Sequence, residues 1–315
     1  CDGFPCFIDA KSDADVNCIR PSMGSENVHL ITEAKVNRLH TSESGKEITG
    51  VEAEIEGETQ TFSGDIVVVA CGAVNSAVLL LKSANEQHPN GLANSSDQVG
   101  RNFMKHLAAA VVGLSLKENH SVFQKTLGLN DYYWGEPGFE YPMGHVQLLG
   151  KVNHRMLSLD VPKIAPTLAL RIAAKRTVDW WLTGEDAPEA NNRVSVKNGK
   201  VTLDYTPNNM TAFKRLIKRW IKTIREVDNE GSMLPVSWYF SKILPIGAIA
   251  HQVGTCRFGT DPATSVLDIN CKSHDIDNLY VVDGSFFPSS AAVNPSLTIM
   301  ANAMRVGDHL IERLG

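Results

Sequence analysis

The sequence predicts a mixed α/β protein that combines an incomplete nucleotide-binding domain with a domain built on an antiparallel sheet. Three observations support this fold class. A continuous apolar strand runs into a glycine turn and a helix around residue 72, the middle of the chain is rich in aromatic residues and turns, and the last segment joins a strand to a long amphipathic helix. These changes of character divide the chain into residues 1–106, 107–245 and 246–315.

The N-terminal segment contains a predicted β-meander. From Asn27 onward, β-rich stretches alternate with the turn clusters SESGKE and EGE. The meander ends in a continuous apolar run over 65–70, which is typical of a strand buried on both faces of a parallel sheet. After a glycine turn at 71–73, apolar residues recur at helical spacing, namely Val74, Ala77, Val78 and Leu81. Strand, glycine turn and helix form half of a nucleotide-binding βαβ unit.

The middle segment contains a predicted hairpin and a predicted helix. Asn198-Gly199 separates two alternating stretches, RVSVK and KVTLDY, which is a strong signal for a two-residue hairpin turn. Further on, apolar residues recur at helical spacing, namely Phe213, Leu216, Ile217, Trp220, Ile221 and Ile224. The opposite face of this helix is basic, and we interpret it as a solvated face because the chain as a whole is acidic.

The last segment contains a strand that ends at Val282, a loop, and a long amphipathic helix. Asn294 is a favourable N-cap residue, and Pro295 suits the first position of a helix. The sequence therefore predicts that the helix starts at this pair. The positive end of the helix dipole would stabilise negative charge close to Asn294.

Composition argues against several classes of function. The 315 residues carry a net charge of -5, so no overall positive charge attracts nucleic acid or an anionic membrane. The sequence has no run of about 18 apolar residues, the length needed to span a bilayer. The six cysteines are sparse and form no C-x-x-C pair, which argues against a disulfide scaffold and against a zinc site. We therefore expect no metal ion.

The start of the chain leaves the localisation open. The opening CDGFPCFIDAKSDADV resembles a loop from the middle of a protein, so we expect a segment upstream of Cys1. The sparse cysteines favour a reducing compartment such as the cytoplasm. A periplasmic location stays open because a leader in the upstream segment would not be visible here.

Three places on the chain have residue types suited to chemistry: the turn at 71–73, the loop HQVGTCRFG that begins at His251, and the helix start at Asn294. The turn offers small residues and backbone N–H groups to a pyrophosphate. A neutral His takes the proton of an alcohol as a hydride leaves, and Asn adds a hydrogen bond to the same oxygen. Each place also has a structural interpretation: a common α/β turn, a surface histidine and a plain helix cap.

Two motifs resemble the C-terminal signature of the glucose–methanol–choline (GMC) flavoprotein oxidoreductases. They are HQVGTCRFGTDP and, after it, NLYVVDGSFFPSSAAVNPSLTIMANAMRVGDHL. Upstream, DIVVVACGAVNSAVLLLKSA resembles the strand, turn and helix of the family's FAD domain. The resemblance implies that 1–106 and 246–315 are parts of an FAD-binding domain and that 107–245 is the substrate-binding domain. The family's N-terminal phosphate loop, G-x-G-x-x-G, has no counterpart in this sequence.

The resemblance also implies roles for individual residues. His251 corresponds to the family's catalytic histidine and Asn294 to its second active-site position. The implied cofactor-binding residues are Val36, Gly72, Ala73, Asn75, Asp283, Gly284, Pro295 and Ser296. The implied reaction is FAD-dependent oxidation of a sugar or alcohol hydroxyl, with hydride transfer to flavin N5 and His251 as the base. The electron acceptor, whether oxygen, a quinone or a cytochrome, stays open.

Two alternatives to this oxidoreductase stay open. Without the phosphate loop, the chain is expected to be inactive alone, and it is either a fragment of the enzyme or a non-catalytic part of a split flavoprotein. A lyase of the same family would keep FAD but use it only structurally. The opening CDGFPCFIDAKSDA is similar to the sugar-oxidising branch of the family. Five aromatic residues suited to stacking on a sugar are interpreted as packing residues: Tyr132, Tyr133, Trp134, Trp180 and Trp181.

Overall fold

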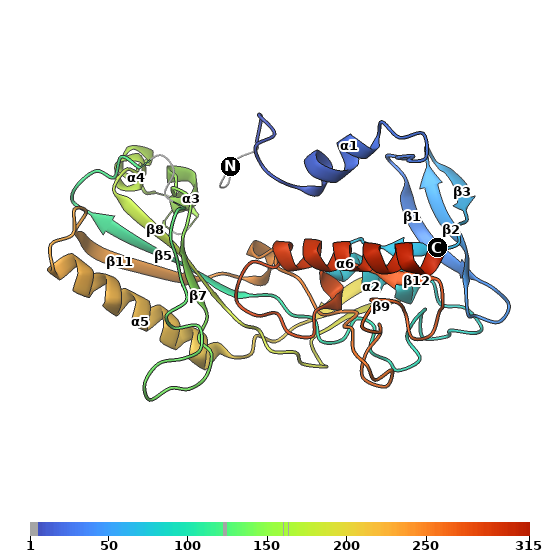
Figure 1. Ribbon diagram of the computed structural model, residues 1–315. Coiled ribbons are helices and arrows are strands. Elements are labelled where there is room, and N and C mark those ends of the chain that lie inside the picture. Colours follow the sequence, from blue (N-terminus) through green and yellow to red (C-terminus); the bar gives the residue numbers. More distant parts are fainter. Residues whose placement is uncertain (1–5, 122–124, 160, 163) are drawn as a thin grey trace.

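The computed structural model describes residues 6–121, 125–159, 161–162 and 164–315. The chain forms two lobes, each with its own hydrophobic core (Figure 1). Both ends of the chain build the first lobe, and most of the middle segment builds the second. The sheets are antiparallel apart from one parallel pair of strands, so the predicted mixed α/β class is confirmed.

An antiparallel meander lies at one side of the first lobe. It consists of β1 (Lys35–Thr41), β2 (Ile48–Ile55) and β3 (Glu58–Phe62), with β2 in the centre. The predicted meander is therefore confirmed, although its first strand begins at Lys35 and not near Asn27. A π-helical turn, Asp15–Ile19, and the short α1 (Arg20–Ser22) precede it.

A parallel pair of strands joins the two ends of the chain. β4 (Val67–Val69) pairs with β12 (Leu279–Val281), and α2 (Ala73–Lys82) follows β4 directly. The prediction that this strand is buried on both faces is wrong, because the Val68 side chain is 45% exposed. Only the face that carries Val67 and Val69 packs against the core.

The C-terminal segment completes the first lobe. After β12, a 3-10 turn at Gly284–Phe286 leads into a loop and then into α6 (Ser296–Leu314). Side-chain hydrogen bonds connect this segment to the first hundred residues. Asn278 holds the backbone of Ile48 with two bonds, of 2.7 Å to its N–H and 2.9 Å to its carbonyl. The first lobe is therefore closed by contacts between residues more than 200 positions apart.

A five-stranded antiparallel sheet forms the second lobe, in the order β11-β5-β8-β7-β6. The strands are β5 (Leu107–Ser115), β6 (Gly128–Leu129), β7 (His145–Leu148), β8 (Thr177–Gly184) and β11 (Val236–Ile243). The predicted amphipathic helix, α5 (Met210–Asn229), packs its apolar stripe on one face of this sheet (Figure 1). Two short helices, α3 (His154–Ser158) and α4 (Thr167–Ala174), lie on the other face.

The predicted hairpin is present but belongs to the first lobe. β9 (Arg193–Lys197) and β10 (Lys200–Asp204) are joined by Asn198 and Gly199, whose φ angles of 51° and 75° are those of the predicted turn. Val194 is fully buried in the first core, and its N–H donates to the carbonyl of Gly100 at 2.8 Å. The interval 107–245 therefore contributes to both lobes.

A short 3-10 turn, Ile246–Ala248, follows β11 and leads into the loop of His251. Among the residues described above, no helix combines the length and the apolar character needed to span a bilayer.

Candidate active site

The two predicted catalytic residues meet at the junction of the two lobes. Asn294 Nδ2 lies 3.3 Å from His251 Nε2, although the residues are 43 positions apart. Both line a cavity of ≈ 240 Å³, which we name the His251 cavity. Its lining consists of Lys125, Gln147, Leu149, Trp181, Ala248, Ile249, Ala250, His251 and Asn294. The cavity is therefore formed by the sheet of the second lobe and by the two loops that carry the predicted pair.

A second histidine, His106, lies behind His251. Its Nδ1 is 2.8 Å from His251 Nδ1, and its Nε2 is 3.0 Å from the carbonyl oxygen of Ser290. A carbonyl only accepts, so His106 Nε2 carries the hydrogen and the Nδ1 of the neutral ring is a lone pair. His251 Nδ1 must then be the donor between the two rings. The Nε2 of His251 is left with its lone pair, and this is the nitrogen that faces Asn294.

Both histidines are neutral at physiological pH. Burial lowers the pKa of His106 to about 4, and its side chain is only 1% exposed. Burial also lowers the pKa of His251, and the positive charge of Lys125 contributes to the shift. A neutral His251 with its lone pair on Nε2, facing the neutral Asn294 amide, is able to accept a proton.

Asn294 does not cap α6, which corrects the prediction from the sequence. The helix starts at Ser296, Pro295 occupies the N-cap position, and no side chain caps the first turn. The Asn294 amide is turned to the His251 cavity, where its Oδ1 accepts from Gln147 Nε2 at 3.4 Å. Because Gln147 holds the oxygen, the Asn294 NH₂ group is directed at His251.

The predicted cofactor residues near α2 form a connected group. The Asp283 carboxylate accepts from the backbone N–H of Gly72 at 2.9 Å and from the hydroxyl of Ser76. Its other oxygen accepts from the N–H of Ser285 at 2.8 Å and from the Ser285 hydroxyl. Protein donors therefore occupy the whole carboxylate, so Asp283 joins α2 to the 3-10 turn and only its backbone is left for a ligand.

The other predicted cofactor residues differ in exposure. Gly72 and Asn75 are exposed at the start of α2, and Ser296 is exposed at the start of α6. Ala73, Gly284 and Pro295 are buried. Val36 lies on β1 opposite Ala53, with its side chain 40% exposed.

Reasoning from the sequence missed three residues of the site: His106, Gln147 and Trp181. Trp181 was interpreted from the sequence as a packing residue, and the structure places it in the wall of the His251 cavity. Trp180 packs against Trp220, with their ring centroids 4.6 Å apart. Neighbouring residues of a strand point to opposite faces, so only one of the two adjacent tryptophans can face α5. This alternation was the available signal for Trp181. His106 and Gln147 gave no comparable signal, since their roles depend on contacts across 145 and 147 positions.

The fold and the site together define a class of oxidoreductase. Two family models described as GMC oxidoreductase match the chain, one over residues 2–108 and one over residues 188–303. The chain belongs to the GMC oxidoreductase family.

Particular relatives are oxidases and dehydrogenases. The 6'''-hydroxyparomomycin C oxidase of Streptomyces lividus is 29% identical and covers 100% of this chain. The 2-methyl-1,2-propanediol dehydrogenase of Mycolicibacterium austroafricanum is 27% identical over 90% of the chain. This chain spans 57% and 54% of these two relatives, respectively.

A solved structure shows the same fold. Pyridoxine 4-oxidase from Mesorbium loti superimposes with a TM-score of 0.68 at 19% identity, over 94% of this chain and 60% of that protein. At this level of identity the match establishes the fold and not the substrate.

Proposed function

We propose that this chain carries the catalytic residues of an FAD-dependent oxidoreductase that oxidises the CH–OH group of an alcohol or a sugar. One observation carries the proposal: in a cavity at the junction of the lobes, the Nε2 lone pair of a neutral His251 accepts from the Asn294 amide at 3.3 Å. The two relatives named above, an oxidase and a dehydrogenase, support it, as does the paromamine 6'-oxidase of Streptomyces fradiae, which is 28% identical over 97% of this chain.

The residues at the two helix starts fit a phosphate-bearing cofactor. Neither α2 nor α6 has a side-chain cap, so the N–H groups of their first turns are available to acceptors. Gly72, with φ of 85°, faces open space, since a Cβ at this position would meet no atom within 4 Å. Gly72 and Asn75 would hold the phosphate or ribityl part of FAD, and Pro295 and Ser296 its pyrimidine edge. The backbone of Val36 would meet the adenine.

The chain's own residues bind and deprotonate the alcohol. A hydroxyl that replaces the direct contact between His251 and Asn294 donates its proton to His251 Nε2 and accepts a hydrogen bond from Asn294 Nδ2. As the proton moves to His251, the carbon loses a hydride with its electron pair and the C–O bond becomes a carbonyl. FAD, when bound, would supply the acceptor for that hydride at its N5 atom. Gln147 keeps the Asn294 amide in the donating orientation.

The test is His251→Ala in the full-length protein loaded with FAD. Alcohols and sugars are mixed with it anaerobically, and the loss of visible flavin absorbance gives the rate of reduction. We expect bound flavin to be retained while reduction slows by about a hundredfold or more, the usual contribution of a general base. Oxygen and a quinone, offered in turn, then identify the electron acceptor.

Gln252→Ala is the matched control, because Gln252 is the exposed neighbour of His251 in the same loop. The flavin of this variant should be reduced at the same rate as that of the wild type. Equal rates for His251→Ala and the wild type would disprove the assignment of the base. A wild-type flavin that no hydroxyl compound reduces would favour a lyase or a non-catalytic chain.

A further inference from the structure

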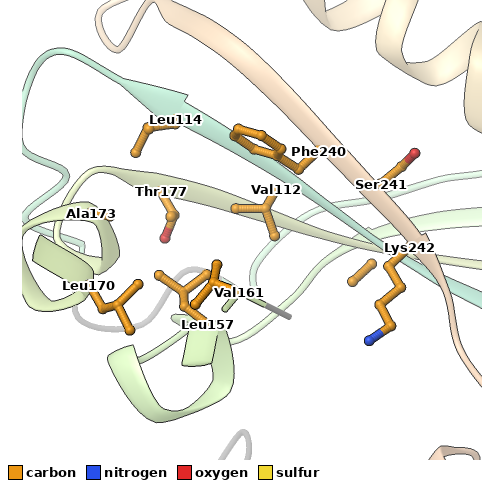
Figure 2. A pocket seen from close by; sticks show the side chains of 11 residues that line it. Val112, Leu114, Leu157, Val161, Leu170, Ala173, Thr177, Phe240, Ser241 and Lys242 are labelled. Atoms are coloured by element: carbon orange, nitrogen blue, oxygen red, sulfur yellow. The ribbon is translucent and has the colours of Figure 1, made fainter. Parts of the chain in front are cut away.

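A second cavity lies on the sheet of the second lobe, beneath α3 and α4. Its volume is ≈ 510 Å³, and we name it the apolar pocket. It is lined by Ala110, Val112, Leu114, Leu157, Val161, Leu170, Ala173, Thr177, Phe240, Ser241 and Lys242. Figure 2 shows side chains of α3 and α4 facing those of the strands across this space. The volume falls in the range that binds a small organic molecule.

The apolar pocket and the His251 cavity share one face of the sheet. Ala110 of β5 lines the apolar pocket and pairs with Trp181 of β8, which lines the His251 cavity. Residues paired across antiparallel strands lie on the same face, about 5 Å apart. On the next strand, Lys242 of the apolar pocket is followed after a short turn by Ala248 of the His251 cavity. The two cavities are therefore neighbours.

The buried hydroxyl of the apolar pocket, that of Thr177, is already hydrogen-bonded, and the other two polar lining residues, Ser241 and Lys242, are exposed. The Thr177 hydroxyl lies 3.2 Å from the carbonyl of Ala174 and 2.9 Å from Lys151 Nζ, and it is also hydrogen-bonded to Asp179. Eight of the eleven lining residues are apolar. A sugar hydroxyl placed among these apolar residues would lose its hydrogen bonds to water without replacement, which is unfavourable. A hydrocarbon chain would lose none.

We propose that the apolar pocket binds the hydrocarbon part of an amphipathic alcohol whose hydroxyl lies between His251 and Asn294. This inference rests on the proposed oxidation and specifies its substrate class, which is an alcohol with an extended apolar group and not an unsubstituted sugar. Each buried methylene contributes about 0.8 kcal/mol, which is about fourfold in kcat/KM.

The experiment measures flavin reduction in the full-length enzyme with glucose and with unbranched primary alcohols from butanol to decanol. We expect kcat/KM to rise about fourfold per methylene until the pocket is filled. In Ala173→Phe, the ring fills the pocket from α4, so the gain with chain length should disappear while butanol is oxidised as in the wild type. Leu170→Trp, which adds a larger ring system from the adjacent turn of α4, should act in the same way.

Ala169→Phe is the control, because Ala169 lies on α4 but is exposed. It should keep the dependence on chain length, and unchanged butanol oxidation shows that the filled variants are folded. A wild-type enzyme that oxidises glucose and butanol as well as decanol overturns the inference but leaves the proposed function intact. The same holds if filling the pocket has no effect. No reduction by any compound contradicts the proposed function itself.

Discussion

At the scale of single residues, a chain of hydrogen bonds selects the basic nitrogen of His251. The Ser290 carbonyl fixes the hydrogen of His106 on Nε2, and His106 Nδ1 then accepts from His251 Nδ1. Without this acceptor, the ring of His251 is free to carry its hydrogen on Nε2 and to lose the lone pair that faces the substrate. We therefore regard His106 as a positioning residue.

The variant His106→Phe removes the acceptor and keeps a ring of similar size. We expect flavin reduction to slow by about tenfold to a hundredfold, because His251 would lose part of its activity as a general base. Flavin binding should be unchanged. The measurement is the anaerobic reduction rate. His106→Asn restores an acceptor near the position of Nδ1 and should recover much of the rate. If Asn and Phe slow the reaction equally, the effect of His106 is on packing and not on the tautomer.

Asp186 is a buried carboxyl next to the same network. Its Oδ2 accepts from the N–H of Lys105 at 3.2 Å and from the Tyr205 hydroxyl at 3.0 Å, while Oδ1 has no partner among the described residues. Burial raises the pKa of Asp186 to about 6. A raised carboxyl pKa stabilises the fold below the unfolded value of 3.8, and this contribution is lost as pH rises to about 6.

His106 has the opposite dependence on pH. Its pKa is lowered from 6.5 to about 4. Above pH 6.5 His106 therefore does not change the free energy of unfolding, and as pH falls from 6.5 toward 4 it lowers that free energy. The two contributions oppose each other over the interval from pH 4 to 6. The stability of the wild type should therefore change little there on their account.

The variant Asp186→Asn separates the two contributions. At pH 8 it should be more stable than the wild type, by at most about 3 kcal/mol, because a buried charge is removed. At pH 4 the difference should vanish, since Asp186 is then neutral in the wild type. The measurement is the free energy of unfolding at pH 4, 6 and 8. A loss of stability at pH 8 would mean that the ionised carboxylate holds its neighbours more strongly than its pKa implies.

At the scale of elements, the position of β7 depends on a glycine directly before it. Gly144 has a φ of 131°, and a Cβ at this position would lie 2.1 Å from the carbonyl oxygen of Thr183 on β8. Only glycine allows β7 to lie this close to β8. Since β7 carries Gln147, the same contact sets the distance between Gln147 and Asn294.

The variant Gly144→Ala should lose about 3 kcal/mol or more of stability, because the new methyl group collides with backbone and the left-handed angle is strained. Gly138→Ala is the matched control. Its φ is 80°, but a Cβ there meets nothing within 4 Å, so it should cost only about 1–2 kcal/mol. Denaturant unfolding of the two variants gives the comparison, and equal losses would rule out the clash with Thr183.

The elements that the sequence predicted well are those defined by local patterns. α5 has its periodic apolar stripe, and the β9–β10 hairpin has an Asn-Gly turn. The prediction failed where neighbours decide the outcome. Val68 is exposed because no layer of the described chain covers its face of the strand. Asn294 does not cap α6 because its amide is hydrogen-bonded to Gln147 and His251 instead. A single sequence contains no record of such contacts.

At the scale of the whole molecule, the site exists because the two lobes meet. His251 and Asn294 come from loops of the C-terminal segment, whereas Gln147 and Trp181 come from the sheet of the second lobe. The loop before α6 is held on that sheet, since the Thr183 hydroxyl donates at 2.6 Å to the carbonyl of Ala292. The sequence motifs predicted His251 and Asn294. They could not predict Gln147 and Trp181 on the opposite wall of the cavity, because these two residues reach the site only through the packing of the two lobes.

The contacts that close the first lobe have a consequence for how the protein is made. Gly72 and Ile48 find their partners in Asp283 and Asn278, which are 211 and 230 residues further on. A ribosome adds about 5–20 residues per second, so the partners of these groups are synthesised roughly 10–45 s later. During this time β4 has no β12 beside it, and its apolar edge is open to other chains. We expect the yield of folded protein to depend on chaperones that shield this strand on the nascent chain.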